Sequence, residues 1–72
     1  MAEQEVRRYR DCYGQEAVAV RDSYGRAWKL TFVHGSDGYT RRCRSYQHMR
    51  AVLDANGYGW TEVDSWRITR PA

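Results

Sequence analysis

Large apolar residues at every second position make segment 27–33 the clearest structural signal in the chain. Trp28, Leu30 and Phe32 share one parity, and polar residues stand between them. A period of two places successive side chains on opposite faces of a strand. The pattern therefore predicts a half-buried strand whose large side chains face the core.

A five-residue phrase, Arg-Asp-x-Tyr-Gly, occurs at 10–14 and returns eleven residues later at 21–25. In each copy the Asp can accept hydrogen bonds from backbone N–H groups two residues on, and the Gly can take a positive φ. Both copies predict tight turns around the strand-forming segment 15–20. This order predicts an antiparallel meander, and we expect Val18 and Val20 to share the buried face with the large residues of the next strand.

Segment 39–44 alternates over a short length, which predicts a fourth strand after a glycine-rich hairpin loop at 34–38. Ser45 is the expected N-cap of a helix over Tyr46–Asn56, and Gly57 is the expected C′ residue. The helix carries an apolar stripe that should lie on one face of the sheet. The stripe consists of Tyr46, Met49, Val52 and Leu53.

The two ends of the chain give different signals. Residues 5–11 fit either a helical turn or a first strand, because their two apolar positions are three apart while a turn signal follows closely. Near the other end, Trp66 and Ile68 alternate with polar residues, which predicts a last strand. Residues 63–65 are expected to interrupt this strand with a bend or a bulge.

The predicted order is β-β-β-β-α-β, or β-β-β-α-β if the first segment is not a strand. This is an α+β fold, an antiparallel meander of three to four strands with one helix on one face and a C-terminal strand. The 72 residues are expected to form a single small domain with loose ends at 1–4 and 71–72. Because no apolar stretch could span a bilayer and no signal region is evident, we expect a cytoplasmic protein.

Positive charge is only slightly in excess, with 12 basic against 9 acidic residues, but its chemistry is one-sided. Eleven of the twelve cations are arginines. The guanidinium fork suits phosphate, carboxylate and base edges, which favours a recognition surface. A genome rich in G and C would also raise the arginine content without any functional meaning.

Catalytic and metal chemistry have little support in the sequence. The two cysteines, Cys12 and Cys43, and the two histidines, His34 and His48, show none of the spacings of a zinc site. Neither histidine stands near a Ser or Cys nucleophile, and no phosphate-binding loop is present. We therefore expect neither enzyme activity nor a metal or other cofactor, and we expect both cysteines to be free thiols.

Surface recognition is the better hypothesis. If the helix covers the face with the large residues, the opposite face should carry four cations, and tyrosines in the turns should flank it. The candidate nucleic-acid-binding residues are Arg21, Lys29, Arg42, Arg44, Tyr24 and Tyr39. An ordinary solvated face is the alternative explanation of this surface.

Three strands followed by a helix over residues 16–56 resemble, in their order, the arm-type DNA-binding domains of phage and transposon integrases. The resemblance implies contacts to DNA through arginine and aromatic side chains of the sheet. We therefore expect a small non-enzymatic module that binds nucleic acid, with DNA favoured. The alternative is a small protein-binding inhibitor or adaptor of the kind that phages and mobile elements encode against host defences, because Tyr, Trp and Arg also dominate protein interfaces.

Overall fold

The chain forms a five-stranded sheet with one helix in the computed structural model, which describes residues 2–22, 25–33 and 39–70. This arrangement confirms the predicted α+β fold and the order β-β-β-β-α-β. The elements are β1 (Ala2–Arg10), β2 (Glu16–Asp22), β3 (Trp28–Val33), β4 (Tyr39–Cys43), α1 (Tyr46–Ala55) and β5 (Thr61–Arg70). The predicted hairpin loop at 34–38 lies outside the described residues.

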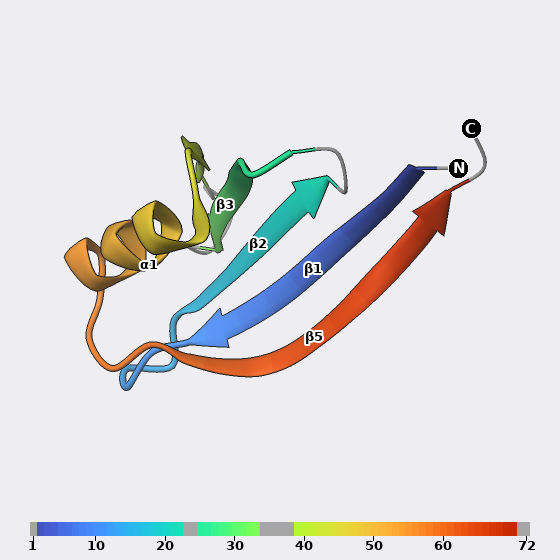
Figure 1. Cartoon of the computed structure of the whole chain (residues 1–72). Coiled ribbons are helices and arrows are strands. Elements are labelled where there is room, and N and C mark those ends of the chain that lie inside the picture. Colours follow the sequence, from blue (N-terminus) through green and yellow to red (C-terminus); the bar gives the residue numbers. More distant parts are fainter. Residues whose placement is uncertain (1, 23–24, 34–38, 71–72) are drawn as a thin grey trace.

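The strands lie in the order β4-β3-β2-β1-β5, and every neighbouring pair is antiparallel. The first four strands are therefore a meander, and β5 crosses back after α1 to pair with β1 at the far edge (Figure 1). The helix lies near β3 and β4, whereas β1, β2 and β5 extend away from it (Figure 1). The sheet thus has a helix side and an opposite side, which we call the open face.

The N-terminal segment is a strand, which resolves the ambiguity over residues 5–11. β1 already begins at Ala2, whose backbone pairs with Arg70 of β5. The expectation that residues 2–4 are part of a loose end is therefore wrong, because pairing with both β2 and β5 holds this strand. Residues 1 and 71–72, the other expected loose ends, lie outside the described part of the chain.

The irregularity expected at residues 63–65 is a β-bulge. Arg8 pairs with Asp64 while the next residue, Tyr9, pairs with Glu62, so Val63 is an extra residue on the β5 side. A bulge of this kind bends the strand and increases its twist without ending it. As a result β5 runs as one strand of 10 residues beside β1.

The first predicted turn forms as expected around Asp11. Its carboxylate Oδ1 accepts from the backbone N–H groups of Tyr13 at 3.0 Å and Gln15 at 2.7 Å, and Gly14 has φ 83°. The second copy of the phrase differs, because Gly25 does not have a positive φ. The glycines of the two copies therefore differ in backbone conformation.

The buried side of β2 is the reverse of the prediction. Pairing with β3 places Ala17 opposite Phe32 and Ala19 opposite Leu30, and all four side chains are fully buried. Two small residues between large ones leave room for the helix above the sheet, whereas valines there would crowd it. Val18 and Val20 consequently lie on the open face, and so does Val6.

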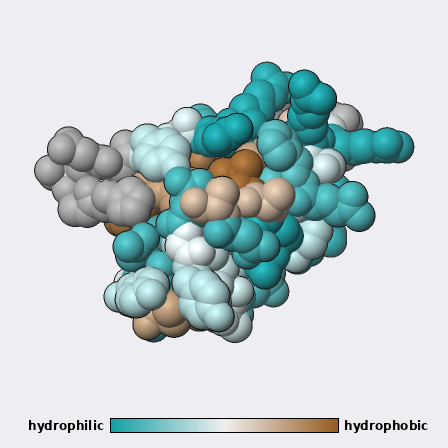
Figure 2. Space-filling view, turned by 90° about the vertical axis from the view of Figure 1, so that its left-hand side faces the viewer, coloured by the Kyte–Doolittle hydropathy of each residue, from teal (hydrophilic) through white to brown (hydrophobic). Residues whose placement is uncertain are grey.

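The helix begins and ends close to the predicted residues. Ser45 is the N-cap, its hydroxyl accepting from the N–H of His48 at 3.2 Å. The stripe residues Met49, Val52 and Leu53 are buried, whereas Tyr46 is half-exposed. The outward surface at this end of the molecule is mostly hydrophilic, with hydrophobic residues in a small central area (Figure 2).

Gly57, the predicted C′ glycine of the helix, is needed for a different reason. Gly57 lacks a positive φ, and the C-cap is Asn56. A Cβ at Gly57 would lie 2.5 Å from Nε1 of Trp60, whose ring packs edge-on against Phe32 at 5.9 Å. Glycine is needed here so that the buried indole can approach the backbone closely.

The two cysteines lie in different parts of the molecule and are free thiols. Cys12 is exposed in the β1–β2 turn, where its N–H donates to the carbonyl of Tyr58, and Cys43 is buried at the end of β4. Burial raises the pKa of the Cys43 thiol, although Arg41 partly opposes this shift. Within the described residues, no helix has the length and apolar character needed to cross a bilayer.

Candidate nucleic-acid interface

Pairing between the strands aligns five residues into one straight row across the open face. Each is directly opposite the next on the neighbouring strand, so all five side chains are on the same side of the sheet. This cross-strand row consists of Arg42, Lys29, Val20, Val6 and Trp66. It changes from basic at the β4 edge to apolar at the β5 edge.

The basic end of the row is exposed and uncompensated. Lys29 and Arg42 are both exposed, and neither forms an ion pair with any acidic residue in the part of the chain that the structure describes. Like charges directly opposite one another destabilise a sheet. An anion bound between the two side chains would remove that repulsion.

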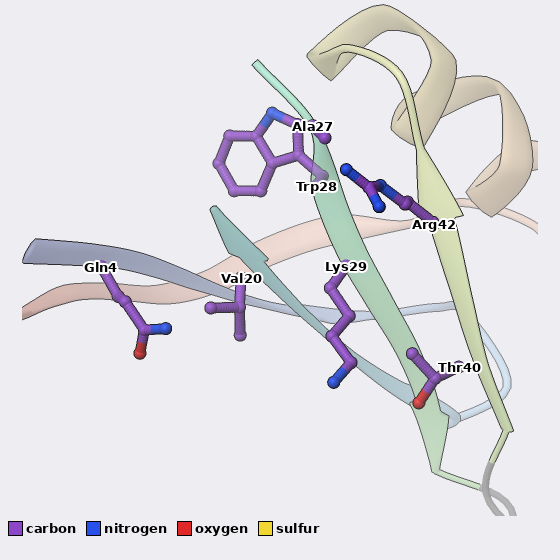
Figure 3. A pocket seen from close by; sticks show the side chains of 7 residues that line it. All are labelled: Gln4, Val20, Ala27, Trp28, Lys29, Thr40 and Arg42. Atoms are coloured by element: carbon purple, nitrogen blue, oxygen red, sulfur yellow. The ribbon is translucent and has the colours of Figure 1, made fainter. Parts of the chain in front are cut away.

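A shallow hollow of about 570 Å³ lies at this end of the row (Figure 3). Lys29 and Val20 project into it from neighbouring strands, and Arg42 and Trp28 line it near the start of β3 (Figure 3). Ala27, Gln4 and Thr40 complete its lining. Two cations beside an indole and several polar groups can bind a phosphate-bearing ligand.

Arg21 lies on the helix side, contrary to the prediction that it joins the basic face. It has the parity of Ala19 and stands opposite Trp28 and Glu5. The prediction failed because it assigned the wrong parity of β2 to the core. Three of the four predicted cations therefore lie away from the helix side of the strands, but only Lys29 and Arg42 are neighbours.

Arg21 is instead part of an ion-pair cluster with Glu5 and Arg7. The two carboxylate oxygens of Glu5 accept from Arg21 and Arg7, each at 2.7 Å. The guanidinium groups of Arg7 and Arg21 each lie 5.5 Å from the centre of the Trp28 ring, and that of Arg7 lies 5.2 Å from the Tyr46 ring. These contacts fix the arginines as parts of the fold.

The pKa values of the cluster reflect this pairing. Burial acts to raise the pKa of the Glu5 carboxyl, but the hydrogen bonds and charges of Arg7 and Arg21 outweigh it and hold the pKa below its usual value. Glu5 in turn raises the pKa of Arg7 against the opposing effect of burial. Glu5 and Arg7 are therefore both charged at neutral pH.

The remaining predicted site residues have separate positions. Arg44 is exposed in the turn between β4 and α1, where its backbone N–H donates to Nδ1 of His48 at 3.0 Å. Tyr39 belongs to the helix side, stacks on Phe32 at 5.0 Å and donates its hydroxyl hydrogen to Asn56 at 2.9 Å. Tyr24 lies outside the described residues.

Trp66 is the residue that the sequence analysis did not assign to the site. Its alternation with Ile68 was recognised, but nothing in the sequence shows that β5 pairs with β1 and so places Trp66 opposite Val6. The indole of Trp66 is 42% exposed, whereas Val6, its neighbour in the row, is only 4% exposed. The open face thus has a wide aromatic surface available at the end opposite to the cations.

Metal chemistry finds no support in the described residues, which contain no group of three or more His, Cys, Asp or Glu side chains placed to hold an ion. His34, one of the four sulfur and imidazole groups considered above, lies outside them. What the cross-strand row offers chemically is a pair of cations without an acidic partner among the described residues, an apolar middle and an exposed indole.

No protein family, curated protein or solved structure matches the chain significantly. Inferences about function therefore rest on the geometry of the open face.

Proposed function

We propose that this protein is a small non-enzymatic module that binds nucleic acid through its open face, with DNA as the favoured ligand. The observation that carries the proposal is the pair Lys29 and Arg42, two exposed cations directly opposite each other with no acidic partner in the described chain. These two side chains bind the phosphates, and no cofactor takes part.

The position of the pair favours an anionic ligand over plain solvation. Four arginines of the sheet have carboxylate partners, and two of these pairs, Arg10–Glu16 and Arg67–Glu3, lie on the exposed surface. Lys29 and Arg42 keep a repulsive arrangement that an acidic neighbour could have relieved. Phosphate oxygens supply the missing negative charge, and binding them releases counterions condensed on the nucleic acid.

The test is fluorescence anisotropy with a labelled DNA duplex and a labelled single strand over a range of salt concentrations. Each lost phosphate contact should reduce the magnitude of the log–log salt slope by about 0.9 for duplex and about 0.7 for single strands. The double variant Lys29→Ala with Arg42→Ala should therefore lower it by about 1.8 or about 1.4, respectively. The affinity should fall most at low salt.

The matched control is Arg26→Ala with Arg41→Ala, which removes the same charge from two exposed arginines outside the cross-strand row. The control should keep the parent's salt slope. An equal effect of both double variants would show only general attraction between a basic protein and DNA, and would contradict the assigned site.

The alternative function, an inhibitor or adaptor that binds a protein, makes a different prediction. Interface affinity then depends on buried rings and should be nearly independent of salt. If the folded parent bound neither oligonucleotide at low salt, the nucleic-acid proposal would be wrong and the protein-binding function would replace it.

A further inference from the structure

The apolar end of the cross-strand row distinguishes between the kinds of nucleic acid that the open face could bind. Trp66 is the one large aromatic side chain on this face among the described residues, and 42% of its surface is exposed. The other strongly exposed rings, Tyr13 and Tyr58, belong to the turn and the loop at the end of the sheet. Trp66 is thus the one ring placed in line with the cations.

The cations that would contact phosphates and the ring that would contact a base lie far apart along the row. Lys29 and Trp66 are three strands apart, which is roughly 14 Å at about 4.8 Å per strand. Val20 and Val6 fill the space between them and offer no polar group. A ligand that uses both ends must therefore be charged at one end and must present an apolar, flat surface at the other.

A negative charge at the β5 edge adds to the difference between the two ends of the row. Asp64 has the same parity as Trp66 and lies on the same side of the bulge. Its exposed side chain is on the open face opposite Arg8 of β1, and no ion pair joins the two among the described residues. A carboxylate there repels phosphates, so the ligand's backbone is favoured over β3 and β4 and disfavoured over β5. A duplex laid across the face would bring phosphates of its second strand toward Asp64, whereas a single strand can keep its phosphates at one end.

From these observations, and resting on the proposed function, we infer that the preferred ligand is single-stranded nucleic acid. Its phosphates bind Lys29 and Arg42, and an unpaired base stacks on the indole of Trp66. In a duplex the faces of the bases are already stacked on their neighbours, so only an unpaired base can use an aromatic side chain in this way.

The variant that tests the inference is Trp66→Leu, because leucine keeps an apolar side chain over Val6 while removing the aromatic face. Stacking on a side chain is worth about 5- to 150-fold in affinity per base. We expect Trp66→Leu to weaken binding of a labelled oligothymidylate of about 12 nucleotides by a factor in this range. Trp66→Tyr should restore most of the affinity.

Four further measurements separate stacking from a general loss of structure. Trp66→Leu should leave the salt slope unchanged, since the ring makes no ionic contact, and should bind inorganic polyphosphate as the parent does. Tyr58→Ala, which removes an exposed ring away from the open face, should bind the oligothymidylate like the parent. Circular dichroism should show the same thermal transition for parent and Trp66→Tyr.

Each outcome decides a different question. Parent-like binding of oligothymidylate by Trp66→Leu would overturn the stacking role, and duplex binding as tight as single-strand binding would overturn the preference for single strands. In both cases the proposed function would stand. Failure of the parent to bind any of the oligonucleotides would overturn the proposed function itself.

Discussion

One group of charged residues on each side of the sheet shows the contrast between paired and unpaired charges. On the helix side, Glu5 bridges Arg7 and Arg21, and Arg7 also reaches Glu62 at 3.3 Å. On the open face, Lys29 and Arg42 stand together without an acidic partner among the described residues. The comparison shows that the number of arginines says little about function, because arginines such as Arg7 and Arg21 pair with a carboxylate of their own chain.

The two sides also differ in what covers their apolar residues. The helix side has Met49 and Leu53 of α1 above it, both fully buried, and this is where the main core lies. On the open face Val18 and Val20 stay half-exposed, and Val6 is buried without belonging to the main cluster. Stability should therefore depend mainly on the helix side and ligand binding mainly on the open face.

The largest difference in stability is expected between Leu53→Ala and Val18→Ala. Leu53 is fully buried, so its truncation leaves a cavity and should cost about 2–5 kcal/mol. Val18 is partly in water, and its truncation should cost about 1 kcal/mol or less. Urea unfolding followed by circular dichroism measures both, and equal losses would mean that the helix side is not the main core.

Gly57→Ala tests the close approach of Trp60 to the chain. The added Cβ would lie 2.5 Å from Nε1 of the indole, so overpacking should cost about 1–3 kcal/mol. Gly25→Ala is the matched control, because the nearest atom to its Cβ would be 3.9 Å away and its φ is not positive. Thermal melts should show Gly25→Ala within about 1 kcal/mol of the parent, on the stabilising side. A similar loss at both positions would contradict the packing explanation.

Glu5→Gln should lower stability by about 1–2 kcal/mol at neutral pH, since it removes the carboxylate that Arg7 and Arg21 share, while water still screens both. The folded-state pKa of Glu5 is lowered, so its contribution is present above the usual value of 4.5 and is lost as the pH falls below it. The difference between parent and variant should therefore shrink on acidification.

Urea titrations from neutral pH to well below 4.5 measure this difference. Glu16→Gln serves as the control, because Glu16 pairs with Arg10 on the exposed surface and should matter little at any pH. A constant difference between parent and Glu5→Gln across the acid range would refute the role of the ionised carboxylate.

The smallest effect on stability is expected from the open-face cations. Lys29→Ala with Arg42→Ala should change the free energy of unfolding by no more than about 0.5 kcal/mol, and in the stabilising direction if their repulsion dominates. A differential scanning calorimetry trace is sufficient to show this. A clear loss of stability would assign the pair to the fold and remove the main reason for regarding it as a ligand site.

Much of the fold could be predicted because its signals are local. The alternation in 28–33, the Asp and Gly of the 10–14 turn and the Ser45 cap each depend on residues within one turn or strand, and all of them formed as expected. Helix limits and element order followed from the same short-range patterns. Two expectations about glycines failed, since neither Gly25 nor Gly57 takes a positive φ.

The candidate site could be predicted only in part. Lys29 and Arg42 were assigned to the correct side because β3 has an unmistakable buried parity. Arg21 was misplaced because two valines appear more hydrophobic than two alanines, although the space beneath α1 favours the smaller pair. The sequence thus shows which residues of a strand share a face. Which of the two faces is buried depends on the element that packs against the sheet.

The sequence by itself determined the strands β2 to β5, the helix, the order of these elements and the excess of arginine, and it left the first strand open. The tertiary structure alone decided that β5 lies beside β1, that a bulge at Val63 sets its register, and that Trp66 therefore lines up with Val6, Val20, Lys29 and Arg42. The alternation of apolar and polar residues shows only which side chains share a face within one strand. The alignment of side chains across five strands depends on pairings between residues as far apart in the chain as Val6 and Trp66, which no local pattern specifies.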